Sequence, residues 1–198
     1  MKKIWFIFII FFFINLSNPL LSQSDMGFKG IGVKIGIVDP EDLDATIGFG
    51  TFLDLGTIIP NLNLELNLDY WSKSENSFGF FGVPTEGGFE ASVSDLTVGG
   101  TTKYIFSTNS SKISPFVGGG LGLHFLRLKV KVPGFEIPEF QVPGFEESDT
   151  KTKIGLRFVG GLFINLSSQI EGLAEFRYWI IEDANTLAIL AGIVFKIK

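Results

Sequence analysis

The feature that most constrains the fold is the segment NLNLELNLDYW at positions 61–71, in which polar and apolar residues alternate strictly. Leucine occupies every second position from 62 to 68, and Asn, Glu or Asp lies between. A β-strand points successive side chains to opposite faces, so this segment predicts a sheet with one apolar and one polar face. In a soluble protein the leucines would face a core, whereas in a membrane barrel they would face lipid. Other features of the sequence distinguish a soluble core from a lipid-facing surface.

Segments of the same period recur along the chain, and almost nothing after Asp25 has a helical pattern. We expect eight strands, at about residues 27–38, 43–53, 61–71, 91–107, 113–132, 150–166, 170–181 and 186–197. With the N-terminus on the inner side, both long connections, 73–90 and 133–149, fall on the outer side, as in membrane barrels. The fifth segment changes phase after Phe125, which predicts a bulge or a change of environment.

Glycine gathers on the polar face of these segments, and this observation decides which way the leucines face. A strand face open to water has no reason to omit side chains, but the interior of a small barrel must alternate large residues with small ones. The apolar face is therefore predicted to contact lipid. The glycines are Gly30, Gly32, Gly36, Gly48, Gly50, Gly99, Gly118, Gly120, Gly122, Gly155, Gly161 and Gly192.

The N-terminus predicts export from the cytoplasm. Met1, Lys2 and Lys3 precede an uncharged apolar run at 4–14 and a polar stretch at 15–24, which is the order of a secretory signal peptide. We expect cleavage after Ser22 or Ser24, giving a signal peptide at 1–24 and one barrel domain at 25–198. An uncleaved anchor helix is the alternative, but it needs about 20 apolar residues.

The signal peptide, the eight segments and the motif SPFVGGGLGLHF at 114–125 resemble the outer-membrane β-barrel superfamily of OmpA-type and opacity-type barrels, a porin-like family. The resemblance implies an all-β, eight-stranded, antiparallel, up-and-down transmembrane barrel in the outer membrane of a diderm bacterium. It also implies contact with outer-membrane lipid and with the outer-membrane assembly machinery. The chain departs from the family in ending on Lys198 after Phe195 and Ile197. A soluble, exported, lipocalin-like lipid-binding barrel is the alternative fold.

Charged residues on the polar face are predicted to form an ion-pair network that fills the lumen. A gated ion path is the alternative reading of the same charges. The network residues are Lys34, Glu65, Asp69, Asp95, Lys103, Arg157, Glu171, Glu175 and Arg177, with Lys153 on the same face.

The lone histidine, His124, also lies on the polar face. Outer-membrane lipid A deacylases resemble this barrel and carry a Ser two places after the catalytic His, but Leu126 stands there in this chain. We therefore expect a structural His124 and no enzyme, with a lipid-modifying enzyme as an alternative. The chain has no Cys and no metal-ligand cluster, so we expect no cofactor and no metal.

The two long connections are the predicted contact surfaces, through Phe80, Phe81, Phe135, Phe140 and Phe145. An imperfect repeat, VPGFE, occupies 132–136 and 142–146. We therefore expect a structural, adhesive or surface-binding protein with an extracellular ligand or surface partner, or else a small channel. A monomer is expected, and the net charge of −5 argues against nucleic acid as a partner. The aromatic residues near strand ends predict interfacial girdles: Tyr70, Trp71, Phe80, Phe81, Tyr104, Phe106, Tyr178 and Trp179.

Overall fold

The computed structural model describes residues 24–77, 89–108, 112–132, 135–137, 140–182 and 184–197. The predicted signal peptide lies outside them except for Ser24, and so do Phe80 and Phe81. The strands are β1 (Asp25–Pro40), β2 (Thr46–Ile59), β3 (Leu62–Ser77), β4 (Phe89–Ile105), β5 (Ile113–Val132), β6 (Phe135–Ile137), β7 (Phe140–Val142), β8 (Phe145–Asn165), β9 (Ile170–Ile181) and β10 (Thr186–Lys196). No helix among the described residues is long and apolar enough to span a membrane.

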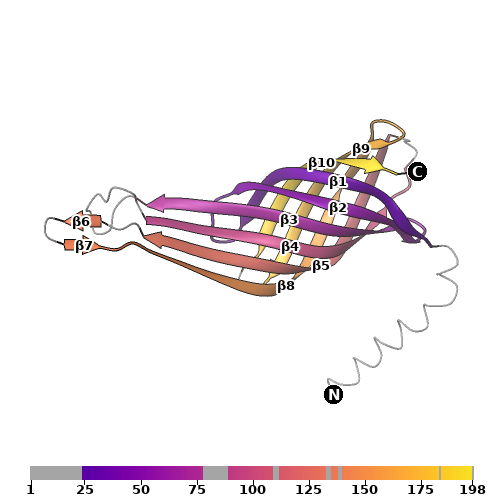
Figure 1. The fold of residues 1–198 in the computed structure, drawn as a ribbon. Helices are drawn as coiled ribbons and strands as arrows, with labels where there is room; N and C mark the ends of the chain where they lie inside the picture. Colours follow the sequence, from indigo (N-terminus) through magenta and orange to yellow (C-terminus); the bar gives the residue numbers. More distant parts are fainter. Residues whose placement is uncertain are drawn as a thin grey trace, which may run out of the picture.

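Eight of the strands close into a single antiparallel barrel (Figure 1). The order around the ring is β1-β10-β9-β8-β5-β4-β3-β2, so each strand pairs with its neighbours in sequence once the β6–β7 hairpin is set aside. The first and last strands pair along most of their length, from Gly30 opposite Lys196 to Pro40 opposite Thr186. This closure removes the sheet edges within the barrel and confirms the predicted fold class.

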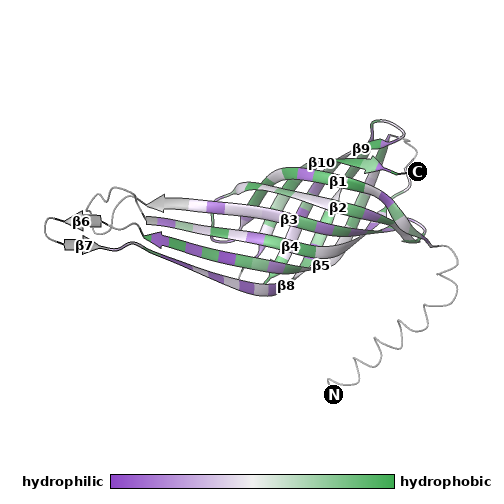
Figure 2. Ribbon diagram, viewed as in Figure 1, coloured by the Kyte–Doolittle hydropathy of each residue, from purple (hydrophilic) through white to green (hydrophobic). Residues whose placement is uncertain are grey.

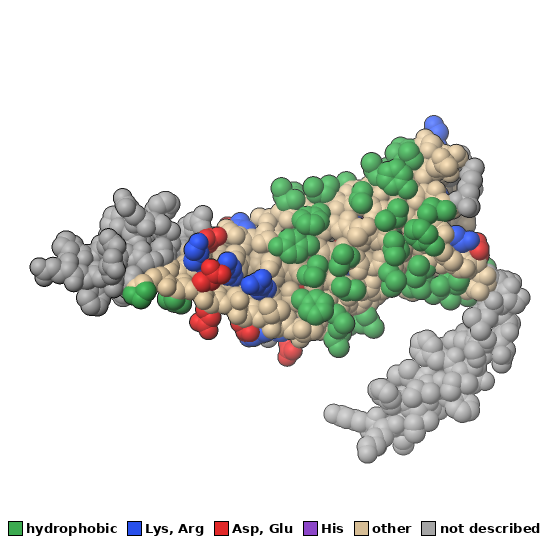
Figure 3. Space-filling model, viewed as in Figure 1, with side chains coloured by type: hydrophobic (Ala, Val, Ile, Leu, Met, Phe, Trp, Pro, Cys, Tyr) green, Lys and Arg blue, Asp and Glu red, His purple; other side chains and the backbone are tan. Residues whose placement is uncertain are grey.

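The leucines of the 61–71 segment point outward and the polar residues point into the barrel. Leu66 and Leu68 are 48% and 43% exposed, whereas Glu65 and Asn67 are 1% and 3% exposed. The exposed apolar side chains gather over the barrel in the space-filling view (Figure 3). A surface of this composition is stable only against hydrocarbon, so the prediction about the leucines is confirmed.

Several strands are longer than predicted. The strand β2 continues to Ile59 through an irregular register between Asp54 and Thr57, so the predicted turn at 54–61 shrinks to two residues. Pro60 and Asn61 make that turn, and Asn61 has the positive φ of 68° that asparagine tolerates. The long connections at 73–90 and 133–149 were predicted as loops, but parts of both belong to strands, including the β6–β7 hairpin.

Four adjacent strands continue beyond the others on one side of the molecule (Figure 1). The last residue of β3 that pairs with β2 is Trp71, and β8 pairs with β9 only from Gly155 onward. Beyond these rungs, β3, β4, β5 and β8 form an open sheet that we call the extension, at residues 72–77, 89–94, 126–132 and 145–153.

The hydropathy of the strands changes where the extension begins (Figure 2). The strand β5 keeps an unbroken register with β8 from Ile113 to Val132 and with β4 from Phe116 to Lys131, so a bulge at the predicted phase change is wrong. What changes is the environment. The outward side chains of the closed barrel form a lipid-facing belt, to which Leu123 belongs. In the extension, Arg127 points to the same outer face and Leu128 points inward.

The inward-facing glycines let neighbouring strands approach closely. A β-carbon on Gly120 would overlap the carbonyl oxygen of Gly100, and one on Gly36 would overlap that of Ile189. The outward-facing Gly160 differs, because a β-carbon there would lie 3.9 Å from its nearest neighbour, the carbonyl oxygen of Phe116. The glycine-rich face of the sequence thus matches the crowded inner surface.

We expect the lipid-facing surface to reject charge. Replacing Leu123 by Arg is expected to lower the free energy of unfolding by about 2–4 kcal/mol if the residue lies near the bilayer centre. The matched change of Thr152 to Arg, in the extension, is expected to have little effect. Urea unfolding in phospholipid vesicles, followed by tryptophan emission, measures both, and equal losses would contradict the assignment of the belt.

The crowded glycines generate a second prediction. Replacing Gly120 by Ala forces a methyl group against the neighbouring strand and is expected to cost about 1–3 kcal/mol, as overpacking usually does. Replacing Gly160 by Ala is the matched control on the lipid side and is expected to be tolerated. The same unfolding assay compares the two variants. Equal tolerance of both changes would contradict the close packing of the inner surface.

Candidate functional site

The lumen is organised around Asp69 of β3, which three cations from other strands share. Its Oδ2 atom accepts from Arg157 Nη2 at 2.5 Å and lies 3.0 Å from Arg177 Nη1. Its Oδ1 atom lies 3.2 Å from Lys34 Nζ. These cations come from β8, β9 and β1, so one carboxylate connects strands on opposite sides of the ring.

Glu175 of β9 is the second centre of the network. It accepts from Arg177 at 2.5 Å, and its other oxygen lies 2.8 Å from Lys103 Nζ. Lys103 also lies 2.8 Å from Glu65, and its ammonium group is 4.5 Å from the centre of the Phe116 ring. These contacts join to those of Asp69 through Arg177, so seven of the predicted lumen charges form one connected network: Lys34, Glu65, Asp69, Lys103, Arg157, Glu175 and Arg177.

The two remaining predicted charges lie apart from that network. Asp95 accepts from His124 Nδ1 at 2.7 Å, and Thr97 lies within 3.0 Å of both. All three of these side chains are buried. Glu171 pairs with Lys196 at 2.5 Å near the end of β10.

Lys153, which was predicted to point into the lumen, lies at its outer end and donates to the backbone oxygen of Glu182 at 2.6 Å. His124 packs edge-on against Trp179, with ring centres 4.5 Å apart. The histidine therefore belongs to the filling of the lumen.

Apolar clusters close the lumen on both sides of the ion pairs. Phe52, Phe116, Phe163, Val159, Leu173 and Val194 form the inner cluster. Val38, Trp71, Ala188 and Leu190 form the outer cluster, with Leu43 and Val93 packed against it. The space between Trp71, Trp179 and Arg177 amounts to about 20 Å³, about enough for one water molecule.

The prediction of an interfacial position is therefore wrong for two of the aromatic residues. Trp71 and Trp179 are buried inside the barrel, whereas Tyr104, Phe106 and Tyr178 are exposed on its outer face. The sequence contains a signal for the buried position of Trp71, because Trp71 alternates in step with Glu65 and Asp69 and therefore points to the same inner face. Phe52 likewise alternates in step with the inward-facing Gly48 and Gly50. Its place in the inner cluster was not predicted from the sequence.

The extension presents charged groups on its outer face (Figure 3). Lys129 of β5 pairs with Glu146 of β8 at 2.8 Å, and Arg127 donates to the Ser148 hydroxyl. The hydrogen bond from Lys129 lowers the pKa of Glu146 below its ordinary value, so this carboxyl stays ionised outside the membrane. A sheet with a charged outer face of this kind suits water and not hydrocarbon.

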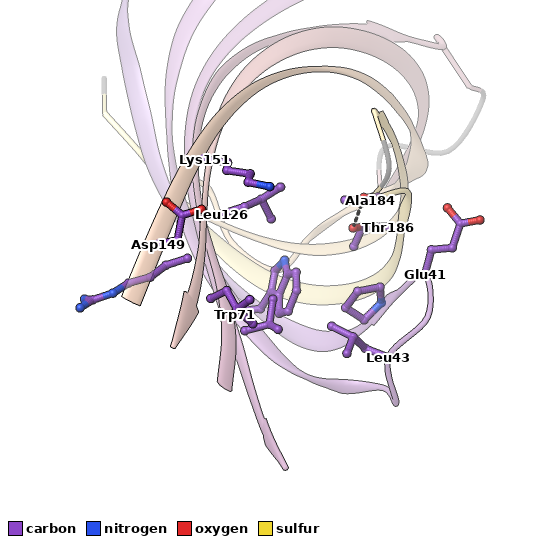
Figure 4. A pocket seen from close by; sticks show the side chains of 12 residues that line it. Glu41, Leu43, Trp71, Leu126, Asp149, Lys151, Ala184 and Thr186 are labelled. Atoms are coloured by element: carbon purple, nitrogen blue, oxygen red, sulfur yellow. Dashed lines mark hydrogen bonds between the residues drawn. The ribbon is translucent and has the colours of Figure 1, made fainter. Parts of the chain in front are cut away.

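The inner face of the extension forms one side of a hollow at the outer mouth of the barrel, which we call the mouth cup (Figure 4). Its volume is about 240 Å³. Trp71, Leu126 and Leu128 supply apolar surface, and Asp149 and Lys151 project from β8. The full lining is Pro40, Glu41, Leu43, Trp71, Val93, Leu126, Arg127, Leu128, Asp149, Lys151, Ala184 and Thr186.

The predicted contact phenylalanines are only partly described. Phe145 begins β8 and is 56% exposed. Phe135 and Phe140 begin β6 and β7, and their side chains lie outside the described residues, as do Phe80 and Phe81 altogether. In the described part of the chain, no three His, Asp or Glu side chains are grouped as a metal site requires.

The chain matches a known protein family over nearly its whole length. The family model for the outer membrane protein β-barrel domain matches residues 7–196. No curated protein matches the sequence.

Solved structures share the fold at low sequence identity. Neisserial surface protein A is 17% identical, covering 85% of this chain and 97% of its own, with a TM-score of 0.58. Ail of Yersinia pestis, solved with the heparin analogue sucrose octasulfate, is 13% identical over 87% of this chain and 99% of its own, also at 0.58. A major outer membrane protein of Thermus thermophilus is 10% identical, covers 85% of this chain and 99% of its own, and has a TM-score of 0.56.

Removing the shared carboxylate should destabilise the barrel. Replacing Asp69 by Asn leaves Arg157 and Arg177 buried without their common acceptor, and we expect the free energy of unfolding to fall by about 3–5 kcal/mol. The double change of Asp69 to Asn and Arg157 to Met should recover part of this loss. Asp25 to Asn, which breaks an exposed pair with Lys29, is the control and should change little. A small loss for Asp69 to Asn would contradict the proposed role of the network.

Proposed function

The chain belongs to the outer membrane β-barrel domain family, and we propose that it is a surface-binding protein whose extension contacts a ligand outside the cell. The observation that carries the proposal is the contrast between the two ends of the strands. Inside the membrane, paired charges and apolar clusters occupy the lumen. Beyond it, four of the eight strands continue as a sheet past the rungs at which the ring closes.

The contents of the lumen argue against transport as the main role. Lys34, Lys103 and Arg177 are all buried and all lie within ion-pairing distance of carboxylates from other strands or neighbouring positions. An ion path would need these contacts to separate and would leave charges unpaired in a low dielectric, which is costly. We therefore place the function on the outer surface rather than in the lumen.

An enzymatic role has less support than binding. The ring of His124 contacts Asp95 and Thr97 inside the lumen, and all three side chains are buried. A catalytic histidine needs to reach a substrate, and this one is enclosed. The barrel also closes on itself without a second copy, so we propose that it acts as a monomer in outer-membrane lipid.

A protein ligand suits the extension better than a polyanion. The structure of Ail carries a heparin analogue, and this chain does place Arg127, Lys129 and Lys131 along one face of β5. However, Lys129 is paired with Glu146, and the chain as a whole has a net charge of −5. Long-range attraction of a sulfated or phosphorylated polymer is therefore weak, and close contact with a polypeptide is favoured.

Shortening the extension tests the proposal. Residues 74–92 and 129–148 are each replaced by an Asn-Gly turn, which joins Lys73 to Val93 and Leu128 to Asp149 at rungs that already pair. Cells displaying this variant are expected to lose most of the adhesion to host-cell surfaces or matrix proteins that the complete protein confers. The measurement is adhesion of a non-adherent strain displaying either form.

A shift in electrophoretic mobility on heating shows whether the shortened barrel still folds. The barrel keeps all eight strands, so we expect the shift to remain. Unchanged adhesion by a folded, shortened barrel would overturn the proposed function.

A further inference from the structure

The β8 edge of the extension has no partner strand among the described residues. From Phe145 to Thr152, β8 pairs with β5 on one side, and β9 begins to pair on the other side only at Gly155. Every residue from 145 to 152 is exposed. In an antiparallel sheet, alternate residues of an edge strand direct both N–H and C=O away from the sheet. This edge therefore offers a row of backbone groups to another extended chain.

The charges along this edge are segregated. Glu146, Glu147 and Asp149 come first, and Lys151 and Lys153 follow. Of those on the inner face, neither Asp149 nor Lys151 has an ion-pair partner among the described residues. Charged edges normally keep strands from pairing at random. A segregated edge does more, because it admits a strand whose charges follow the opposite order and repels one whose charges follow the same order.

The mouth cup lies beside the same edge (Figure 4). Asp149 and Lys151 line it from β8, and Ala184, Thr186 and Glu41 line it from the lower rim of the barrel opposite. A strand added to β8 would lie on the extracellular side of that rim. Every second side chain of such a strand would share the inner face with Asp149 and Lys151 and would be directed toward the apolar surface of the cup.

From these observations we infer that the β8 edge binds an extended segment of a partner polypeptide by strand addition, with one apolar side chain seated in the mouth cup. In the antiparallel arrangement, the segment carries an apolar residue opposite Lys153, an acidic residue opposite Lys151, and basic residues opposite Asp149 and Glu147. This inference rests on the proposed surface-binding function and names the kind of ligand and the surface that it uses. Backbone hydrogen bonds supply affinity, and the charge order and the cup supply specificity.

A synthetic peptide with this pattern is the probe. The peptide Leu-Thr-Glu-Thr-Lys-Thr-Lys-Thr, which reaches no further along β8 than Lys153 and carries a fluorescent label at its C-terminus, is titrated with the exported protein purified from outer membranes in detergent. Saturable binding is expected in the anisotropy of the label. A change in tryptophan emission is also expected, because Trp71 lines the cup, and replacing Trp71 by Phe should abolish that change. The absence of saturable binding would overturn the inference.

Two N-methylated forms of the peptide test for strand addition itself. One form carries N-methyl groups on the Leu, Glu and Lys residues, and the other carries them on the alternate Thr residues. Only one of the two sets of N–H groups can face β8, so one form should lose binding and the other should keep it. Equal binding of the two forms would overturn strand addition and would leave a contact through side chains alone.

A charge exchange tests the register. Replacing Lys151 by Glu is expected to weaken the original peptide by about fivefold, the effect of turning an opposite-charge cross-strand pair into a like-charge pair. A peptide with Lys in place of its Glu should then bind this variant better than it binds the original protein. Lys29 to Glu, at the periplasmic end, is the control and should not change binding.

The outcomes separate this inference from the proposed function. If the shortened barrel loses adhesion but the peptide does not bind the complete protein, the extension acts through another surface and the strand-addition inference fails alone. If the shortened barrel keeps full adhesion, the proposed function fails first.

Discussion

The rest of the structure depends on the burial of charge inside a closed ring that lipid surrounds. Asp69 is shared by three cations whose own side chains are buried, and apolar clusters pack on both sides of these ion pairs. An unpaired charge at this depth would cost several kcal/mol, so the pairs hold β1, β3, β8 and β9 in one relative position. The glycines of the same face complete this arrangement, because they leave the room that the long charged side chains occupy.

Because the lumen is filled, we expect the function to reside in the part of the chain that lies outside the membrane. There the strands keep their register while the solvent changes from hydrocarbon to water. The strand β5 shows this most clearly, because its pairing is continuous while its apolar side chains pass from the outer face to the inner face. The apolar side of the extension then covers the mouth of the barrel, and the result is a cup next to an unpaired strand edge.

The sequence predicted the barrel well and the extension poorly, and the reason is physical. Within the membrane, one face must be apolar at every second residue, so the period-two pattern reveals each strand. In the extension both faces meet water, and the stretch from Phe145 to Lys153 carries Ser, Thr and charges without an apolar alternation. Its strand conformation comes from pairing with β5, so the residues alone suggested a loop. Trp71 and Trp179 lie near strand ends, as interfacial aromatics do, but they alternate in step with the inward-facing residues and are buried.

By itself the sequence determined the number of strands in the barrel, the outward direction of the leucines, and which face of each strand carries charges into the lumen. Those properties follow from local alternation and from the small space that eight strands enclose. Only the tertiary structure decided which charges meet. Asp69 and Arg157 are 88 residues apart in sequence, and they meet because the stagger of the closed sheet brings β3 and β8 to one level across the lumen. The pairing also decided that β3, β4, β5 and β8 run on past the last rungs of β2 and β9, which leaves the β8 edge open.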